Sequence, residues 1–357
     1  MVIEADVAVV GAGIAGVSVA YELSARRSVV VLEQEGQAAY HTTGRSAAMF
    51  LESYGSPEVR ELTAESRAVF DEAGPLLRPR TFLWVAPSPQ LSELSHMSKQ
   101  LPDLEPLTGR EAEDQCPPLR AGWCAAALKE RNAEEIDVLG LHQHYLGNAR
   151  RRGARIVLGA RVEAADHDGT RWHLTTEAGP VKAEVVVNAA GAWADQVAAT
   201  LGTDPIGLRP LRRTAAVARA DAVDPTWPLV ADVGETFYFR PEGANVLLSP
   251  ADETPSEPCD ARPDDLDVAL ALDRVNEATT LGLRSVVTAW AGLRTFTPDR
   301  NPVAGADPAA GGKGLFWLAG QGGYGIQMAP ALAKLAAGAV LGEAAVPDAL
   351  SIERFRS

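Results

Sequence analysis

Three glycines near the start of the chain have the spacing of a phosphate-binding turn. The segment Gly11-Ala12-Gly13-Ile14-Ala15-Gly16 reads G-x-G-x-x-G, and Glu33 follows Gly13 by 20 residues. In such a turn the first glycine permits the tight bend, the second lets the backbone approach a pyrophosphate, and the third lets a helix pack against a strand. The acid can accept hydrogen bonds from ribose hydroxyls. These residues, with Gln34 beside the acid, predict a dinucleotide-binding site.

The elements expected around this turn support the prediction. Asp6–Val10 is a β-branched apolar run that suits a strand buried on both faces, 17–25 reads as a helix, and Ser28–Leu32 reads as a second strand. The helix N-terminus offers free N–H groups and a partial positive charge to phosphates. A purely structural βαβ unit is the alternative, and the acid that ends the second strand favours nucleotide binding.

A second loop after Glu33 combines small residues, hydroxyl groups and one arginine. It reads Tyr40-His41-Thr42-Thr43-Gly44-Arg45-Ser46-Ala47-Ala48. Its N–H and hydroxyl groups could face the phosphates of a long cofactor. The alternative is a simple connection to a helix that starts near Ser46.

Two later junctions between a strand and a helix are also built from small residues. Asn188-Ala189-Ala190-Gly191-Ala192-Trp193 follows one apolar run, and Gly322-Gly323-Tyr324-Gly325-Ile326-Gln327 follows another and precedes a helix expected over 330–341. A nicotinamide cofactor needs chiefly the first turn, whereas a flavin dinucleotide must be held at its adenine, pyrophosphate and ring. Glycines let backbone N–H groups approach a planar ring. For the last junction, a flexible loop is the alternative.

Charge and composition narrow the possible partners and compartment. The formal net charge is −14, from 33 basic and 47 acidic residues, which argues against binding to nucleic acid or an anionic membrane. No apolar run reaches the ~18–20 residues of a membrane span, and we expect a cytoplasmic protein. Cys116, Cys124 and Cys259 lack metal-ligand spacing, so we expect reduced thiols and no metal site.

Taken together, these motifs resemble the D-amino acid oxidase family of flavoproteins, which includes glycine and sarcosine oxidases and D-amino acid dehydrogenases. The similarity covers nearly the whole chain and includes Trp290-Ala291-Gly292-Leu293-Arg294 as a further motif. Within the family, the chain most resembles D-arginine dehydrogenases. The resemblance implies FAD as cofactor, with Val162 and Gly292 among its contacts. It also implies oxidation of an amine C–N bond to an imine that water hydrolyses.

The same resemblance implies an α/β fold in which a Rossmann-like FAD-binding domain carries an inserted α+β substrate domain with a mixed or antiparallel sheet. We expect the FAD-binding domain at residues 1–78, 135–205 and 288–357, and the substrate domain at 79–134 and 206–287. Further helices are expected over 57–72, 91–100, 136–152 and 266–279, and a loop-rich connection over 102–118.

Individual site residues follow from the resemblance. Arg294 matches the arginine that binds the substrate carboxylate, and a guanidinium suits that role because it grips a carboxylate through two hydrogen bonds. Other matched residues contribute to the same site: Arg213, Tyr238, Tyr54 on a mobile loop, and Gly323 and Gln327 near the flavin and substrate. Strand alternation sends only one of Arg212 and Arg213 toward the site.

Two departures from the D-arginine dehydrogenase pattern concern the substrate side chain. Met49 replaces a histidine, and Thr81 replaces the acid that holds a basic side chain. An apolar wall is expected instead, formed by Met49, Phe50, Leu51, Phe82 and Leu229. We therefore expect an N-substituted glycine or a neutral or apolar D-amino acid as substrate, and oxygen or another electron acceptor.

Other functions remain open from the sequence. One is a broad dehydrogenase of the D-arginine type, in which an acid such as Glu52 would line the pocket. The others are a flavin hydroxylase, a nicotinamide-dependent dehydrogenase, or a nucleotide-binding module without catalysis.

Overall fold

The computed structural model describes residues 2–356, and its first β-sheet carries the glycine-rich turn. The central strand β1 (Ile3–Val10) pairs in parallel with β2 (Val29–Leu32) and β12 (Gly179–Asn188). Parallel pairing continues to β9 (Arg155–Val157) beside β2 and to β20 (Leu315–Ala319) beside β12. Three antiparallel strands complete this eight-stranded sheet, β10 (Val162–His167), β11 (Trp172–Thr176) and β19 (Val303–Ala306). The predicted parallel sheet with strand, turn, helix and strand is confirmed.

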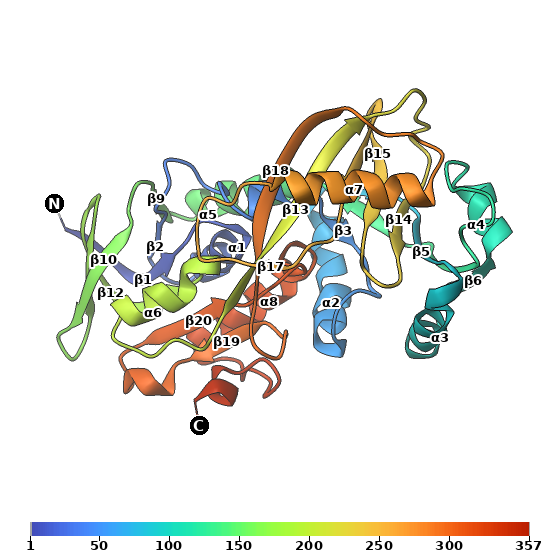
Figure 1. Ribbon diagram of the computed structural model, residues 1–357. Coiled ribbons are helices and arrows are strands. Elements are labelled where there is room, and N and C mark those ends of the chain that lie inside the picture. The colour runs from blue at the N-terminus through green and yellow to red at the C-terminus, as the bar shows by residue number, and fades with distance from the viewer. Residues whose placement is uncertain (1, 357) are drawn as a thin grey trace.

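Helices cover both faces of this sheet, as its continuous apolar strands require. Val7, Val9 and Val31 share a core with α1 (Ile14–Leu23), α5 (Val138–Arg151) and α8 (Gly325–Val340). The alternate residues Ala8 and Val10 face the opposite side, where α6 (Ala194–Thr200) lies. Helices α1 and α8 also pack against each other (Figure 1).

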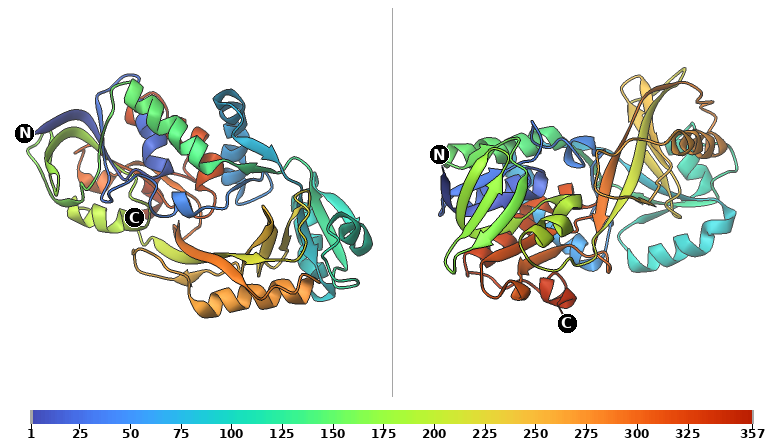
Figure 2. Two further views of the ribbon diagram at one scale, coloured as in Figure 1. Left: turned by 90° about the horizontal axis from the view of Figure 1, so that it is seen from above. Right: turned by 60° about the vertical axis from the view of Figure 1, so that its left-hand side comes forward.

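The second sheet is mixed, as predicted, and has nine strands. Strand β14 (Leu229–Asp232) runs parallel to β5 (Phe82–Ala86), whereas the other pairs are antiparallel. The remaining strands are β6 (Glu105–Thr108), β7 (Ala126–Glu130), β13 (Arg209–Arg219), β15 (Tyr238–Glu242), β16 (Asn245–Ser249), β17 (Thr254–Pro255) and β18 (Val286–Phe296). Helix α7 (Asp265–Ala278) covers the face that points away from the first sheet (Figure 2).

Alternation along the strands of this second sheet separates a structural core from an inner wall. Leu83, Val85 and Val230 pack on the side of α7. Their neighbours Phe82 and Trp84 face the other side, where they cluster with residues of the first half of the chain. Because side chains alternate in a strand, a single sheet supplies both the core under α7 and the inner wall.

A small three-stranded sheet and one long helix connect the two large sheets. The small sheet has the order β3 (Met49–Phe50), β8 (Glu134–Ile136) and β4 (Leu77–Pro79). Helix α2 (Pro57–Ala73) begins with Ser56, whose Oγ accepts a hydrogen bond from Val59 N at 3.2 Å, and packs against α8. The chain therefore passes from β3 into α2 through a short loop that lies between the two sheets.

Three local predictions are wrong. No helix starts near Ser46, because residues 43–45 form a 3₁₀ turn that leads into β3. The connection over 102–118 is not loop-rich, since it contains β6 and α4 (Gly109–Gln115), which begins with a capping box of Thr108 and Glu111. Helix α8 begins at Gly325 rather than at Pro330, so the glycine-rich segment ends directly in a helix N-terminus.

The proposed division into two domains stays a prediction, although the sheets bear on one boundary. Strand β18 pairs along most of its length with β13 in the second sheet, so residues 288–296 belong to that sheet. Helix α3 (Leu91–Gln100) lies at the outer edge of the part of the molecule that contains the second sheet (Figure 1). Within residues 2–356, no helix combines the length and apolar character needed to cross a membrane.

Candidate active site

Two adjoining cavities are lined by most of the predicted site residues. A cavity of about 220 Å³ lies beside the glycine-rich turn, and one of about 270 Å³ lies against the second sheet. The two share six lining residues, Gly13, Thr42, Thr43, Ala189, Gly191 and Ala192. Their end-to-end arrangement suits a long dinucleotide rather than a compact ligand.

The smaller cavity contains the predicted ribose-binding acid in an oriented form. Glu33 is buried, and its carboxylate accepts hydrogen bonds from Ala12 N at 2.7 Å and Glu35 N at 3.0 Å. Burial raises the pKa of Glu33 above its ordinary value, although these hydrogen bonds oppose the shift. Other predicted cofactor residues line this cavity: Gly11, Gln34, Val162, Ala190 and Trp193.

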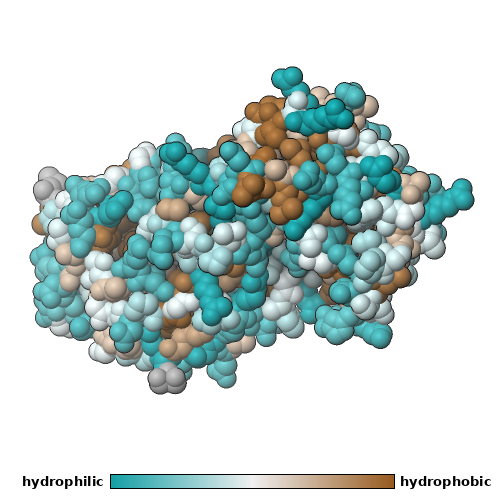
Figure 3. All heavy atoms as spheres, in the orientation of Figure 1, coloured by the Kyte–Doolittle hydropathy of each residue, from teal (hydrophilic) through white to brown (hydrophobic). Residues whose placement is uncertain are grey.

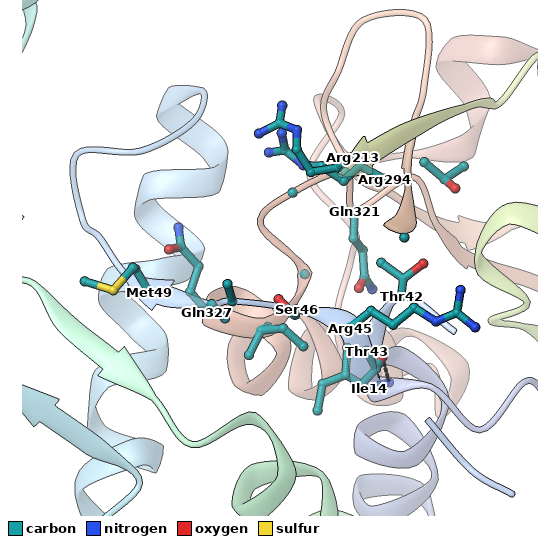
Figure 4. Close-up of a pocket in the computed structure, with 18 of the residues that line it drawn as sticks. Ile14, Thr42, Thr43, Arg45, Ser46, Met49, Arg213, Arg294, Gln321 and Gln327 are labelled. Carbon is teal, nitrogen blue, oxygen red and sulfur yellow. Dashed lines mark hydrogen bonds between the residues drawn. The ribbon is translucent and has the colours of Figure 1, made fainter. Parts of the chain in front are cut away.

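The N-terminus of α1 meets the requirements for binding a phosphate group. Its N-cap residue Gly13 has no side chain to cap it, and its first turn contains no acid. A Cβ placed on Gly13 would meet only Thr43 Oγ1, at 3.3 Å, so the space in front of this residue is open. Thr43 Oγ1 accepts a hydrogen bond from Ile14 N at 3.0 Å, which links the second loop to this turn (Figure 4). An anion at this position would meet the positive end of the helix.

Two predicted cofactor glycines line neither cavity and serve packing instead. A Cβ on Gly16 would lie 1.9 Å from Gly11 O, so this glycine permits the close contact between α1 and the turn. A Cβ on Gly44 would lie 2.3 Å from Ala39 O. Gly16 is buried, in keeping with the packing role that the spacing assigns to it, whereas Gly44 is exposed and lies outside both cavity walls.

The second loop lines the larger cavity and ties it to β18. Ser46, Ala47 and Ala48 lie in the cavity wall, as predicted, and Thr42 Oγ1 donates to Leu293 O at 2.8 Å. The guanidinium of Arg45 points away from the other site residues and donates to Ala261 O at 2.8 Å and Ala291 O at 3.0 Å (Figure 4). Its guanidinium therefore anchors the loop, and only the rest of the residue faces the cavity.

The glycine-rich segment before α8 accommodates the side chain of Arg294. A Cβ on Gly323 would lie 1.5 Å from Arg294 Nη2, and one on Gly322 would lie 2.2 Å from a carbon of the Phe296 ring. Tyr324 does not line the cavity, contrary to the prediction, and its ring packs against Tyr54 with centroids 4.9 Å apart. The other predicted residues of this region, Gly292, Gly325 and Ile326, lie in the cavity wall together with Ala15 and Ile14 of the first turn.

Gln327 is fully used in holding the loop that carries Tyr54. Its Oε1 accepts from Leu51 N at 3.2 Å, and its Nε2 donates to Leu51 O at 3.3 Å and to Thr63 Oγ1 at 2.9 Å. The residue lines the larger cavity and is buried. Its amide therefore fixes the start of the loop, because both Nε2 hydrogens and Oε1 take part in these bonds.

Arg294 is the central polar group of the larger cavity. It is 9% exposed, and its Nη2 donates to the Tyr54 hydroxyl at 2.9 Å. Its Nη1 lies 3.6 Å from Glu253 Oε1 and is buried without a hydrogen-bond partner among residues 2–356. Burial opposes its charge, but Tyr54, Tyr324 and Glu253 outweigh burial and raise the pKa of Arg294. The group stays a cation, and the bond to Tyr54 is the one hydrogen bond of its guanidinium among residues 2–356.

Arg213 lies beside Arg294, as Figure 4 shows, whereas Arg212 points to the other face of the sheet. Arg213 Nε donates to Asp252 O at 2.8 Å, and Arg212 Nη2 donates to Asp267 at 2.8 Å. Burial and the neighbouring Arg294 lower the pKa of Arg213. Strand alternation therefore selects Arg213, which lines the cavity together with Tyr238.

The wall opposite these arginines is apolar, but its predicted member Phe50 does not line the cavity, and neither does Thr81, which was predicted in the substrate pocket. Met49, Leu51 and Leu229 line the cavity as predicted, together with Phe82. Phe50 instead packs on the opposite side of β3 against Phe70, with ring centroids 5.4 Å apart, because adjacent residues of a strand face opposite ways. Thr81 precedes β5 and does not line the cavity.

Several lining residues were not predicted from the sequence. They are Trp84, Ala231, Phe237, Glu235 and Gln321. Trp84 and Ala231 follow from strand alternation once Phe82 and Leu229 are placed. Glu235 lies in the turn between β14 and β15, and its Oε2 is 3.5 Å from the Tyr54 hydroxyl. Asp232, whose Oδ1 accepts from Thr236 N at 2.6 Å and Phe237 N at 2.9 Å, is the turn-forming signal that could have placed it.

Metal and thiol chemistry have no visible place in this site. Across residues 2–356, no group of three or more His, Cys, Asp and Glu residues is arranged to hold a metal ion. Burial raises the pKa of Cys116 to about 12 and that of Cys124 to about 11, so both thiols stay protonated. Neither residue lines either cavity.

Comparisons with known proteins agree with this arrangement. Residues 6–339 match the family described as FAD dependent oxidoreductase. The chain is 27% identical over 344 residues to the glycine oxidase of Geobacillus kaustophilus (strain HTA426), a match that covers 91% of this chain and 90% of that protein. The crystal structure of the Geobacillus kaustophilus glycine oxidase superposes with a TM-score of 0.85 at 23% identity over 97% of both chains.

A second solved structure extends the similarity of fold. The L-proline dehydrogenase from P. horikoshii superposes with a TM-score of 0.85 at 19% identity, over 98% of this chain and 96% of that one. The narrower resemblance to D-arginine dehydrogenases does not follow from these matches and stays a prediction.

The residues present fit the family's cofactor. Glu33 would bind the adenosine ribose, the open N-terminus of α1 would bind the pyrophosphate, and the larger cavity would hold the ring beside the N-terminus of α8. The cradle in front of Gly13, which a side chain would fill, is the observation that favours this fit. On the match over residues 6–339 and on this geometry, the chain belongs to the FAD dependent oxidoreductase family, and FAD is its cofactor.

Proposed function

We propose that this protein oxidises the C–N bond of a small amine that also carries a carboxylate. The observation that carries the proposal is the buried cation Arg294, which lines the larger cavity and whose guanidinium makes one hydrogen bond among residues 2–356, from Nη2 to the Tyr54 hydroxyl. A buried guanidinium suits a carboxylate, because the ion pair satisfies both the charge and the hydrogen bond. The names of two similar proteins, a glycine oxidase and an L-proline dehydrogenase, support an amino acid as the substrate class.

In this proposal, residues of the chain mainly bind and orient the substrate. Arg294 and Tyr54 hold the carboxylate, Arg213 adds positive charge, and Tyr238 lies in the wall beside them. FAD, when bound, supplies the acceptor for the hydride that leaves the carbon next to nitrogen. The resulting imine is hydrolysed by water. Little acid–base machinery is needed if the amine arrives unprotonated, so positioning supplies most of the rate enhancement.

The apolar wall supports a neutral substituent on the substrate. Met49, Phe82, Trp84 and Leu229 are buried side chains that line the cavity and belong to one cluster. Each methylene that moves from water into such a wall contributes about 0.8 kcal/mol. We propose an N-substituted glycine or a neutral or apolar D-amino acid as the substrate, because both place a carboxylate beside an oxidisable C–N bond.

One observation favours a second candidate, a basic D-amino acid. Glu235 lines the same cavity and could pair with a substrate ammonium or guanidinium. Its Oε2 already lies 3.5 Å from the Tyr54 hydroxyl, at the side of the cavity where that loop lies. We rank this candidate second because Glu235 is the one acid in a wall that is otherwise apolar or aromatic.

An anaerobic flavin-reduction screen tests both candidates. The holoenzyme would be mixed with D-leucine, D-phenylalanine, D-arginine and a series of N-alkyl glycines, with L-leucine as the stereochemical control. We expect the second-order rate constant of flavin reduction, measured at low substrate concentration, to rise with the length of the apolar chain of the substrate and to be low for D-arginine. A clear preference for D-arginine that disappears in Glu235→Gln would favour the second candidate. Absence of reduction by every amine would refute C–N oxidation.

A further inference from the structure

A buried carboxylate outside the cavity wall contacts the loop that carries Tyr54. Glu130 ends β7 and pairs across the sheet with Phe82 of β5, so both side chains project from the inner face of the second sheet. Phe82 reaches the cavity, whereas the Glu130 carboxylate reaches the loop between β3 and α2. Glu130 is 7% exposed, which is unusual for an acid and calls for a specific partner.

The partner of Glu130 is Ser53, the residue before Tyr54. Glu130 Oε1 accepts a hydrogen bond from Ser53 N at 3.3 Å, and Oε2 accepts a second bond from Ser53 Oγ. Burial raises the pKa of Glu130, whereas the Ser53 bonds and the backbone N–H of Glu52 act to lower it. The hydrogen bonds of this carboxylate therefore all go to this one loop.

The loop is short, and its two ends are already anchored. Gln327 holds both backbone groups of Leu51 at the start, and Ser56 caps α2 at the end. Between these anchors, Tyr54 N donates to Leu51 O at 3.3 Å, and the Tyr54 hydroxyl accepts from Arg294. Ser53 is thus the point at which the second sheet can fix the middle of the loop independently of Tyr54 itself.

We propose that Glu130 is a positioning residue for the substrate site, in that its two bonds to Ser53 hold Tyr54 against Arg294 and close the loop over the carboxylate pocket. Glu130 touches neither the cavity nor the expected cofactor position, so it acts through Tyr54. This inference rests on the proposed function only in assuming that the pocket receives a carboxylate.

The first test measures the loop without any ligand. Hydrogen–deuterium exchange would be followed by mass spectrometry in the FAD-loaded protein, on the peptide that covers residues 51–59. We expect faster exchange in Glu130→Ala and in Ser53→Ala than in the wild type, with Glu130→Gln in between because the amide oxygen still accepts one bond. Unchanged exchange in the alanine variants would overturn the proposal.

The second test measures binding and rate separately. The probe is 4-methylpentanoate, which has the carbon skeleton of leucine but no amine, and its binding is read from the flavin absorbance spectrum. Removal of a hydrogen-bonded buried acceptor predicts a dissociation constant about tenfold higher in Glu130→Ala. The limiting rate of flavin reduction by D-leucine should change much less. A probe affinity equal to that of the wild type would contradict the proposed role.

A double-mutant cycle with Tyr54→Phe shows whether Glu130 acts through the tyrosine. If it does, Glu130→Ala weakens probe binding much less in the Tyr54→Phe protein than in the wild type. If Glu130→Ala raises the dissociation constant of the probe by the same factor in the wild type and in the Tyr54→Phe protein, the proposal is overturned. Glu105→Gln is the matched control, since Glu105 lies on the neighbouring strand β6 and pairs with the exposed Arg131 at 2.7 Å.

Two outcomes separate this inference from the proposed function. If D-leucine and N-alkyl glycines reduce the flavin of neither the wild type nor any variant, the proposed amine oxidation is wrong. Hydrogen–deuterium exchange and probe binding still report on the loop in that case. If Glu130→Ala does not fold, Ser53→Ala and Glu130→Gln carry the same tests, because each weakens the Glu130–Ser53 hydrogen bonding without emptying the buried site of the Glu130 side chain.

Discussion

Replacing Arg294 by methionine should weaken substrate binding severely while leaving FAD in place. The guanidinium is buried and lines the larger cavity, and its one hydrogen bond among residues 2–356 is the 2.9 Å bond from Nη2 to Tyr54. Truncation of one partner of a buried, hydrogen-bonded charge pair costs roughly 2–5 kcal/mol. The dissociation constant for substrate should therefore rise by about 30-fold to several thousand-fold. The dissociation constant of the Arg294→Lys protein should lie between those of the wild type and Arg294→Met, because an ammonium keeps the charge but lacks the planar fork of a guanidinium.

Anaerobic stopped-flow reduction of the flavin gives the dissociation constant from the concentration dependence and the limiting rate from its plateau. Arg300→Met is the matched control. Arg300 also pairs with Glu253, at 2.8 Å, but its side chain is about half exposed and does not line the cavity. Such a pair contributes below about 1 kcal/mol, so substrate binding should barely change. If the Arg294→Met protein binds the substrate as tightly as the wild type, and its flavin is reduced as fast, the carboxylate is held by another residue.

Three further predictions concern the turn, the glycine beside Arg294 and a buried histidine. Gly13→Val should abolish FAD binding because its side chain would fill the approach to the pyrophosphate, and the apo-protein Tm should fall only slightly because its Cβ would lie 3.3 Å from Thr43 Oγ1. Glu33→Ala should weaken FAD retention; flavin content after gel filtration tests both variants, and the apo-protein Tm reports on their folding. Gly323→Ala should weaken binding of 4-methylpentanoate with normal flavin content, because its Cβ would lie 1.5 Å from Arg294 Nη2; unchanged affinity in a titration would contradict this. His142 Nε2 lies 3.0 Å from Ala12 O, and burial lowers the pKa of His142 below 6.5. As the pH falls below that value the unfolded chain gains a proton that the folded chain does not, so stability is lost on acidification; His142→Gln should lose less Tm than the wild type between about pH 7 and pH 5.

Local sequence determined the nucleotide half of this protein. The motif consists of Gly11, Gly13, Gly16 and the acid at position 33, and all four lie within one strand, turn, helix and strand. Such a unit can be predicted from the local apolar pattern and the glycine spacing. Alternation along a strand likewise separated Arg213 from Arg212 before any tertiary contact was known. The family resemblance added Arg294, which the structure places in the wall of the larger cavity.

Tertiary structure alone decided which residues meet at the substrate end. Phe50 and Thr81 were predicted there, yet the pleat of β3 turns Phe50 away and the cavity begins at Phe82. Glu130 carries no local signal, because a single acid at a strand end looks like a solvated residue, and the turn signal of Asp232 does not show what Glu235 faces. The partners of Glu235 and Glu130, Tyr54 and Ser53, lie 181 and 77 positions away in the chain. Contacts over such separations depend on how two sheets pack, which the periodicity of any one segment does not specify.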